Sequence, residues 1–235
     1  MRLAIYFFTA VSCMSFTLLA QGAVNGTETE FDCRPAPDPS RIVVAGGSIT
    51  EILFMLGEDN NIVAVDRTSN YPTEVSRFPV VGYVRALSAE GVLSLGPSLV
   101  LGEDDMGPHE VVSQLELTGI EIRRVPEKHS AVGIVDKIIC VATILGYTDD
   151  KIAKIRQDFD GSVKQIAALN DEKATAPKPR VAIIMALRDG VPFAAGSDTS
   201  ADGVIEMAGA ENVFASFDGW KPVSLEVMIS SNPLL

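Results

Sequence analysis

Residues 42–57 read Ile-Val-Val-Ala-Gly-Gly-Ser-Ile-Thr-Glu-Ile-Leu-Phe-Met-Leu-Gly, the pattern of a buried strand, a glycine turn and a helix. The apolar run 42–45 predicts the strand, and the apolar residues that follow recur at helical spacing. Ser48 and Glu51 predict a capping box at the helix start, and Gly57 closes the helix. The lysine and the glycine spacing of a nucleotide-binding P-loop are absent from this stretch, so we interpret its glycines as turn residues.

The same alternation of strands and helices continues along the chain. The next predicted elements are strands at 62–65, 98–101 and 121–124 and helices at 88–94, 108–117 and 130–145. Strands that alternate with helices favour a parallel sheet covered on both faces. An acidic cap at 148–150 then opens a helix of about 22 residues, which at roughly 1.5 Å per residue would cross a small domain.

Part of this pattern recurs after a linker at 173–179. Residues 223–233 match residues 87–97 in register at Ser, Glu, two apolar positions, Ser and Pro. An internal repeat of this size predicts two lobes of similar build. We therefore expect an α/β protein of two Rossmann-like lobes joined by one long backbone helix, with the ligand cleft between the lobes.

The second copy of the repeat stops at residues 233–235, where its matching strand should begin. By comparison with the first lobe, roughly 50 to 70 residues of α/β structure would follow. We therefore expect a truncated chain with an incomplete, loose second lobe. The expected domains are a signal peptide at 1–22, a Pro-rich leader at 23–40, an N-terminal lobe at 41–147, a linking helix at 148–172 and a C-terminal lobe at 173–235.

The first 22 residues have one Arg near the start, an apolar run and small residues at the end. This is typical of a secretory signal peptide, which predicts export to the periplasm. A retained membrane helix and a lipoprotein site at Cys13 are weaker alternatives. Export permits a bridge between Cys33 and Cys140 without requiring one, and the apolar run around Cys140 predicts a buried core thiol. The net charge of −12 argues against a nucleic-acid partner.

Tyr83 and Arg85 stand two residues apart just before the predicted helix at 88–94. If this run is extended, both side chains face the same side. A tyrosine oxygen is a hard anionic donor whose pKa, about 10 when free, falls beside a cation, and tyrosinate is a recognised ligand of haem iron. The alternative is that Tyr83 is a half-buried loop aromatic and Arg85 a solvated charge.

Four segments together resemble the periplasmic haem-binding proteins of bacterial haem-uptake ABC transporters. The segments are 46–52, 65–72, 82–91 and 194–202, and the resemblance extends from about residue 41 to the end of the chain. The Gly-Tyr-x-Arg-x-Leu-Ser-Ala-Glu-Gly run at 82–91 is the most specific of them. The resemblance implies a protein that captures ferric haem in the periplasm and delivers it to an inner-membrane ABC importer.

The resemblance also implies roles for particular residues. Tyr83 would be the axial ligand of the haem iron, with Arg85 beside it. Glu90 and Glu226 would meet arginines on the two subunits of the permease dimer, although both acids also suit a helix N-terminus. An outer-membrane haem receptor system is a further expected partner.

One departure from the family concerns the second lobe. Leu187 stands where some relatives carry a second, histidine ligand, so we expect five-coordinate haem held by Tyr83 alone. The remaining pocket candidates are propionate partners and aromatic walls, with solvated charge or core packing as their alternatives. They are Arg188, Lys221, Tyr71, Phe193 and Trp220.

Two other functions compete with haem transport. A same-fold binding protein for a siderophore, cobalamin or another iron complex is the nearer alternative. His109 and His129 are scattered and are interpreted as surface residues, which argues against a bare zinc or manganese site. An enzyme of the doubly wound type is the third possibility, but the sequence carries no nucleophile elbow, no zinc-protease motif and no nucleotide loop. We therefore expect a binding protein and not an enzyme.

Overall fold

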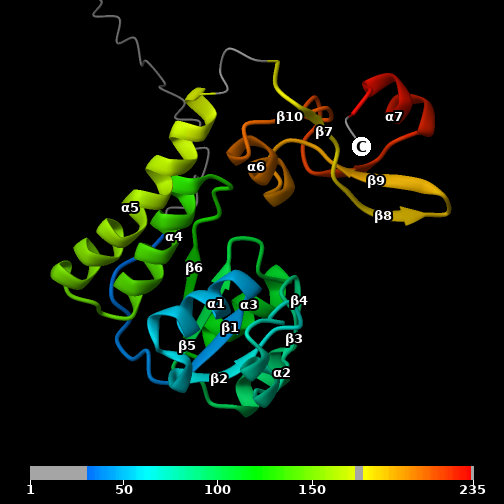
Figure 1. Cartoon of the computed structure of the whole chain (residues 1–235). Helices are drawn as coiled ribbons and strands as arrows, with labels where there is room; N and C mark the ends of the chain where they lie inside the picture. Colours follow the sequence, from blue (N-terminus) through cyan, green and yellow to red (C-terminus); the bar gives the residue numbers. More distant parts are fainter. Residues whose placement is uncertain (1–30, 173–176, 234–235) are drawn as a thin grey trace, which may run out of the picture. The chain divides into compact units, whose positions relative to one another are not determined.

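The computed structural model describes residues 31–172 and 177–233 (Figure 1). These residues form two α/β lobes, and the long helix α5 (Asp149–Glu172) connects them in the sequence. The predicted signal peptide at 1–22 lies outside the described residues. So does the first part of the predicted leader, up to residue 30.

The N-terminal lobe is built on a four-stranded parallel sheet with the order β2-β1-β5-β6. Its strands are β1 (Ile42–Ala45), β2 (Ile62–Val65), β5 (Leu99–Glu103) and β6 (Glu121–Val125). The two central strands consist almost wholly of buried aliphatic residues, as the predicted parallel sheet requires.

Helices cover both faces of this sheet because side chains of a strand alternate between its faces. Ile42 and Val44 pack with α1 (Gly47–Leu56) and α4 (Ala131–Ile144). Val43 and Ala45 face α2 (Ala89–Ser94) and α3 (His109–Leu117) on the other side. Each fully buried aliphatic side chain contributes about 1.5–3 kcal/mol to this packing. Two 3₁₀ turns flank β2. Asp59–Asn61 precedes the strand, and Thr73–Arg77 lies between it and the hairpin that precedes α2.

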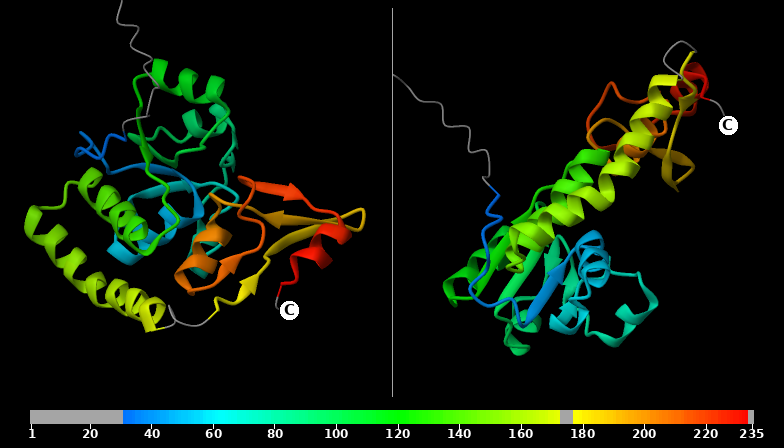
Figure 2. Two further views of the ribbon diagram at one scale, coloured as in Figure 1. Left: turned by 90° about the horizontal axis from the view of Figure 1, so that it is seen from above. Right: turned by 60° about the vertical axis from the view of Figure 1, so that its left-hand side comes forward.

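Helix α5 runs beside α4, and the views in Figures 1 and 2 agree on this. Ile155 and Phe159 of α5 pack against the core formed by β1, α1 and α4. The predicted long helix is therefore present, and its first half is anchored on the N-terminal lobe.

The predicted capping box at Ser48 and Glu51 is wrong. The first helical residue is Gly47, and its N-cap is Gly46, which offers no side chain. The free amides are capped from the loop after β2, because the Gly46 N–H donates to Asp66 Oδ1 at 3.0 Å and the Gly47 N–H donates to Thr68 Oγ1 at 2.9 Å. A Cβ on Gly46 would collide with Glu103, so the glycine is needed there.

Cys140 is a half-cystine and not a free core thiol as expected. It forms a disulfide with Cys33, across 107 residues of sequence. The bridge attaches the segment that precedes β1 to the middle of α4.

The C-terminal lobe differs from a simple copy of the first. The short strands β7 (Arg180–Val181) and β10 (Glu211–Asn212) pair in parallel, but the larger sheet, β11-β9-β8, is antiparallel. The strands of that sheet are β8 (Ile184–Arg188), β9 (Val191–Ala195) and β11 (Trp220–Pro222), and the helices of the lobe are α6 (Ser200–Met207) and α7 (Leu225–Ser231).

The repeat seen in the sequence is preserved at α2 and α7. Ser88 Oγ accepts from the Gly91 N–H, and Ser224 Oγ accepts from the Val227 N–H, so each helix starts with the same side-chain cap. Glu90 and Glu226 occupy the first turn in both cases.

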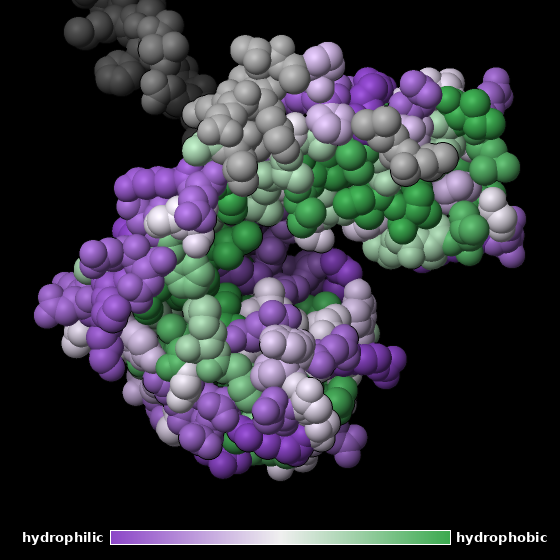
Figure 3. All heavy atoms as spheres, in the orientation of Figure 1, coloured by the Kyte–Doolittle hydropathy of each residue, from purple (hydrophilic) through white to green (hydrophobic). Residues whose placement is uncertain are grey.

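Apolar side chains gather on the surface of the C-terminal lobe (Figure 3). The exposed large residues of this surface lie on β8, β9 and α7, and they are Ile184, Met185, Leu187, Val191, Leu225, Val227 and Ile229. Among the residues that the structure describes, none of the helices combines the length and the apolar character that crossing a bilayer requires.

Candidate functional site

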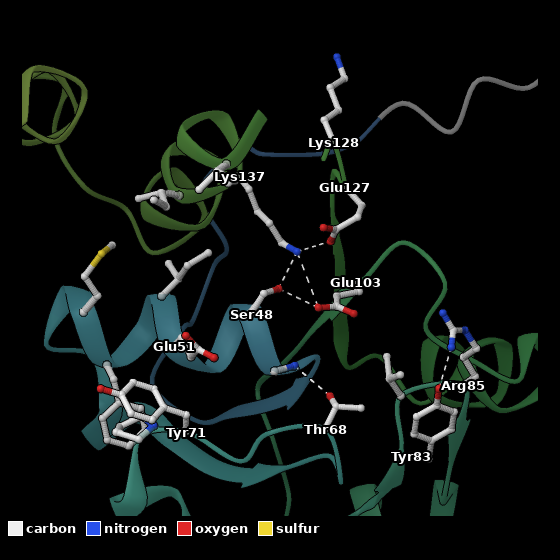
Figure 4. A pocket seen from close by; sticks show the side chains of 18 of the residues that line it. Ser48, Glu51, Thr68, Tyr71, Tyr83, Arg85, Glu103, Glu127, Lys128 and Lys137 are labelled. Carbon is white, nitrogen blue, oxygen red and sulfur yellow. Dashed lines mark hydrogen bonds and ion pairs between the residues drawn. The ribbon is translucent and has the colours of Figure 1, made fainter. Parts of the chain in front are cut away.

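A cavity of about 1070 Å³ opens on the N-terminal lobe, and all the residues that line it lie between 47 and 138 (Figure 4). Its walls come from α1, the loop after β2, α4 and the hairpin of β3 (Gly82–Tyr83) with β4 (Ala86–Leu87). The volume is at the upper end of the range for small-molecule sites. The apolar part of the wall consists of Ile52, Phe54, Met55, Pro72, Val84, Ile134 and Ile138.

The β3–β4 hairpin places Tyr83 and Arg85 at the mouth of this cavity. The run is a tight turn and not an extended segment, since the two strands pair antiparallel and residues 84–85 form the turn. Val84 is buried in the core beneath the hairpin. Because Val84 points inward, its two neighbours both point out, and Arg85 Nη1 donates to Tyr83 Oη at 2.7 Å.

Arg85 makes a second contact, with the carboxylate of Asp105. Partial burial alone would lower the pKa of Arg85, but the negative charge of Asp105 and the contact with Tyr83 raise it above its ordinary value. The guanidinium is therefore a permanent positive charge beside the phenol oxygen. Tyr83 is 36% exposed and lines the cavity.

An ionic cluster centred on the buried Lys137 lies in the cavity wall between α1, α4 and the ends of β5 and β6. Lys137 is 5% exposed, and its Nζ donates to Ser48 Oγ at 2.7 Å and pairs with Glu127. Ser48 Oγ in turn donates to Glu103 Oε1 at 2.7 Å. Burial raises the pKa of Glu103, against the opposing effects of Ser48 and Lys137. The cluster ties together four elements at the cavity (Figure 4).

Sequence reasoning missed this cluster, although one signal was available. Lys137 falls on the apolar stripe of α4, between Ile134 and Ile138 and one turn before Val141. A lysine inside such a stripe must be buried with a partner or interrupt the packing. Its position therefore indicates a buried ion pair.

The other sequence candidates are distributed over both lobes. Tyr71, at 66% exposed, lines the same cavity as Tyr83, and the two lie on either side of the Ser48 cluster in Figure 4. The C-terminal candidates lie outside the lining of this cavity. Arg188 stacks on Phe193 at 4.3 Å in the β8–β9 hairpin, and Lys221 of β11 lies 5.4 Å from the Phe217 ring. Trp220 begins β11.

Within residues 31–172 and 177–233, no three His, Cys, Asp or Glu side chains gather as metal ligands would. His129 Nδ1 lies 3.5 Å from Glu127, and His109 is the first residue of α3.

Two α/β lobes joined by a long helix, with an open cavity on the first, define the two-lobed class of binding proteins. A model of the periplasmic binding protein family matches residues 42–235, and the chain belongs to that family.

Individual relatives differ in what their names say they bind. A periplasmic heme binding protein from Pseudomonas aeruginosa is similar in structure, with 32% identity and a TM-score of 0.74, over 83% of this chain and 69% of that one. A cobalamin-binding protein of Halobacterium salinarum is 26% identical over 83% of this chain and 53% of its own length.

A third relative is an ABC transporter substrate-binding lipoprotein of Bacillus subtilis, YvrC, described as uncharacterized. It is 26% identical over 83% of this chain and 62% of its own length. The chain thus spans between about half and three-fifths of these two curated relatives.

Proposed function

We propose that this protein captures ferric haem and that Tyr83 binds its iron. The observation that carries the proposal is the 2.7 Å hydrogen bond from Arg85 to the phenol oxygen of Tyr83, at the mouth of a large, partly apolar cavity. A positive charge beside a phenol favours its anionic form, and tyrosinate is a hard ligand suited to ferric iron. The haem-binding relative from Pseudomonas supports the same ligand.

The apolar part of the cavity wall suits the flat face of a macrocycle. Its apolar residues on α1 and α4, together with Tyr71, supply surfaces for the macrocycle. Glu51, Glu74, Glu103 and Glu127 also line it, and Lys137 is engaged with two of them. Propionates would be repelled by these carboxylates, so they would point away from the cavity wall. In this proposal Arg188 and Lys221 receive them, and Phe193 and Trp220 form the facing wall of a cleft between the lobes.

Delivery to a transporter is the second half of the proposal. Glu90 and Glu226 hold equivalent positions in α2 and α7, each behind the same serine cap. Two equivalent acids on two lobes suit a permease dimer that presents an arginine from each subunit. The protein would act in the periplasm, as a binding protein without catalytic activity, and would receive haem that an outer-membrane receptor has imported.

The proposed role of each part of the chain follows the expected domains. The lobe at 41–147 carries the iron ligand, the helix at 148–172 connects the lobes, and the lobe at 173–235 carries the propionate partners. The signal peptide at 1–22 would direct export, and the leader at 23–40 would be fixed to the first lobe through Cys33.

Cobalamin is the second candidate ligand, because a Halobacterium relative is named for binding it. Titration of the protein with ferric haem and with cyanocobalamin, followed by absorbance and calorimetry, separates the two. The proposal predicts saturable haem binding with a tyrosinate spectrum and weaker or absent cobalamin binding. Tight cobalamin binding without haem binding would reject it.

A further inference from the structure

The loop that follows β5 is fastened to the β3–β4 hairpin in two places. The Gly107 N–H donates to the Val84 carbonyl at 2.9 Å, and the Leu87 N–H donates to the Gly107 carbonyl at 2.9 Å. Met106, the residue before Gly107, is 3% exposed and packs into the core below. Two backbone hydrogen bonds and one buried side chain therefore fix this loop against the hairpin.

Asp105 lies in this fixed loop and holds one edge of the Arg85 guanidinium. Arg85 Nη2 pairs with the Asp105 carboxylate, while Nη1 of the same group donates to Tyr83 Oη. The guanidinium is planar and its donors form a rigid fork, so a contact that fixes one edge also sets the direction of the other.

Arg85 needs such a partner because its side chain is otherwise free to move. The side chain is 60% exposed, and ordering a long exposed side chain costs rotamer entropy. A single hydrogen bond to a neutral phenol gives only a modest net gain in water. An ionic contact to a fixed loop adds to that gain and favours the one orientation that meets Tyr83.

We propose that Asp105 is a positioning residue, which holds the Arg85 guanidinium on the phenol oxygen of Tyr83 before a ligand arrives. The inference rests on the proposed function, in which that oxygen binds the iron of haem. In the described structure Asp105 pairs with Arg85 and not with Tyr83, so its effect on the ligand passes through Arg85. Asp104, the neighbouring acid on the same loop, does not share this ion pair and provides the matched control.

Nitrogen-15 NMR of the arginine side chains in the ligand-free protein tests the positioning without haem. The Arg85 guanidinium, assigned by its loss in Arg85→Ala, should show restricted rotation in the wild type and in Asp104→Ala. Asp105→Ala should release that restriction. Equal restriction in the wild type and in Asp105→Ala would overturn the proposal.

Haem affinity, measured as a double-mutant cycle, gives the second readout. Asp105→Ala should weaken ferric haem binding roughly two- to fivefold, the upper range expected for one exposed ion pair. In an Arg85→Ala background the same substitution should have no further effect. An equal loss in both backgrounds, or no loss in either, would overturn the proposal. A wild-type protein that binds no haem would instead reject the proposed function, while the NMR result would still decide the positioning.

Discussion

Glu103 is a carboxylate held in a partly buried site at the end of β5, against the first turn of α1. It accepts a hydrogen bond from Ser48, and Lys137 Nζ lies 3.7 Å away. Burial nevertheless dominates and raises the pKa of Glu103 above 4.5. The folded state therefore holds a proton on Glu103 more tightly than the unfolded chain does. The contribution of this proton to the free energy of unfolding is lost as the pH rises through the raised pKa.

A Glu103→Gln variant should show this loss directly. The amide keeps the shape of the protonated acid, so the free energy of unfolding of the wild type should fall relative to the variant as the pH rises from 4.5 to neutral. Urea unfolding at a series of pH values measures the difference. Glu116→Gln, at an exposed position of α3, is the control, and an identical pH profile for Glu103→Gln and the wild type would contradict the account.

The contact between Tyr83 and Arg85 was predicted from sequence, but for an incomplete reason. An extended run and a tight turn both place residues two apart on one side when the residue between them is buried, as Val84 is. Asp105 could not be found in the same way, because its contact with Arg85 depends on how the loop after β5 meets the hairpin. Contacts of this kind come from tertiary packing and leave no local pattern.

At the scale of elements, the Cys33–Cys140 disulfide holds α4, one of the helices that form the cavity wall. Cys140 lies one turn after Lys137 on α4, so the bridge holds the helix that carries the buried lysine. It closes a loop of about 107 residues, for which the loss of chain entropy in the unfolded state is worth up to about 4.7 kcal/mol.

Replacing both cysteines by serine should lower the free energy of unfolding by about 2–5 kcal/mol. The transition should be followed by far-ultraviolet circular dichroism, because the single Trp, Trp220, lies in β11 of the C-terminal lobe and the bridge lies in the N-terminal lobe. Wild-type protein treated with a reductant is the matched control and should unfold at the same urea concentration as the variant. An unchanged midpoint in both would show that the bridge does not stabilise the lobe.

Helices α2 and α7 are the elements through which docking can be tested. Charge reversal of Glu90 and Glu226 together should stop haem delivery to a reconstituted ABC importer, because two ion pairs with the permease would become repulsive. Haem binding by the isolated protein should be unaffected, since neither residue lines the cavity. Reversal of Glu116 is the control, and normal delivery by the double variant would reject the docking role.

The order of strands in the C-terminal lobe was not predictable from the repeat. The antiparallel hairpin of β8 and β9 turns at Asp189 and Gly190, both with positive φ, and Asp-Gly is a strong signal for such a turn. The repeat matched residues 87–97 with residues 223–233, which cover α2 and α7. It gave no information on the strands between these helices. The local repeat thus predicted the two equivalent helices, while the strand pairing of the second lobe differs from that of the first.

At the scale of the whole molecule, the two lobes contribute different parts of the proposed site. The N-terminal lobe carries a complete parallel sheet, the cavity and the Tyr83–Arg85 pair. The C-terminal lobe has a smaller core and an apolar outer surface on β8, β9 and α7. Under the proposed function, the N-terminal lobe would bind the haem iron and residues of the C-terminal lobe would hold the propionate edge.

The visible spectrum of the ferric haem complex tests the central claim, that Tyr83 Oη binds the iron. Wild-type protein and Tyr71→Phe, which alters the other tyrosine of the same cavity, should both show the charge-transfer absorption of high-spin tyrosinate haem. Tyr83→Phe should lack that absorption, because phenylalanine has no oxygen to bind iron. A Tyr83→Phe complex with the wild-type spectrum would contradict the account.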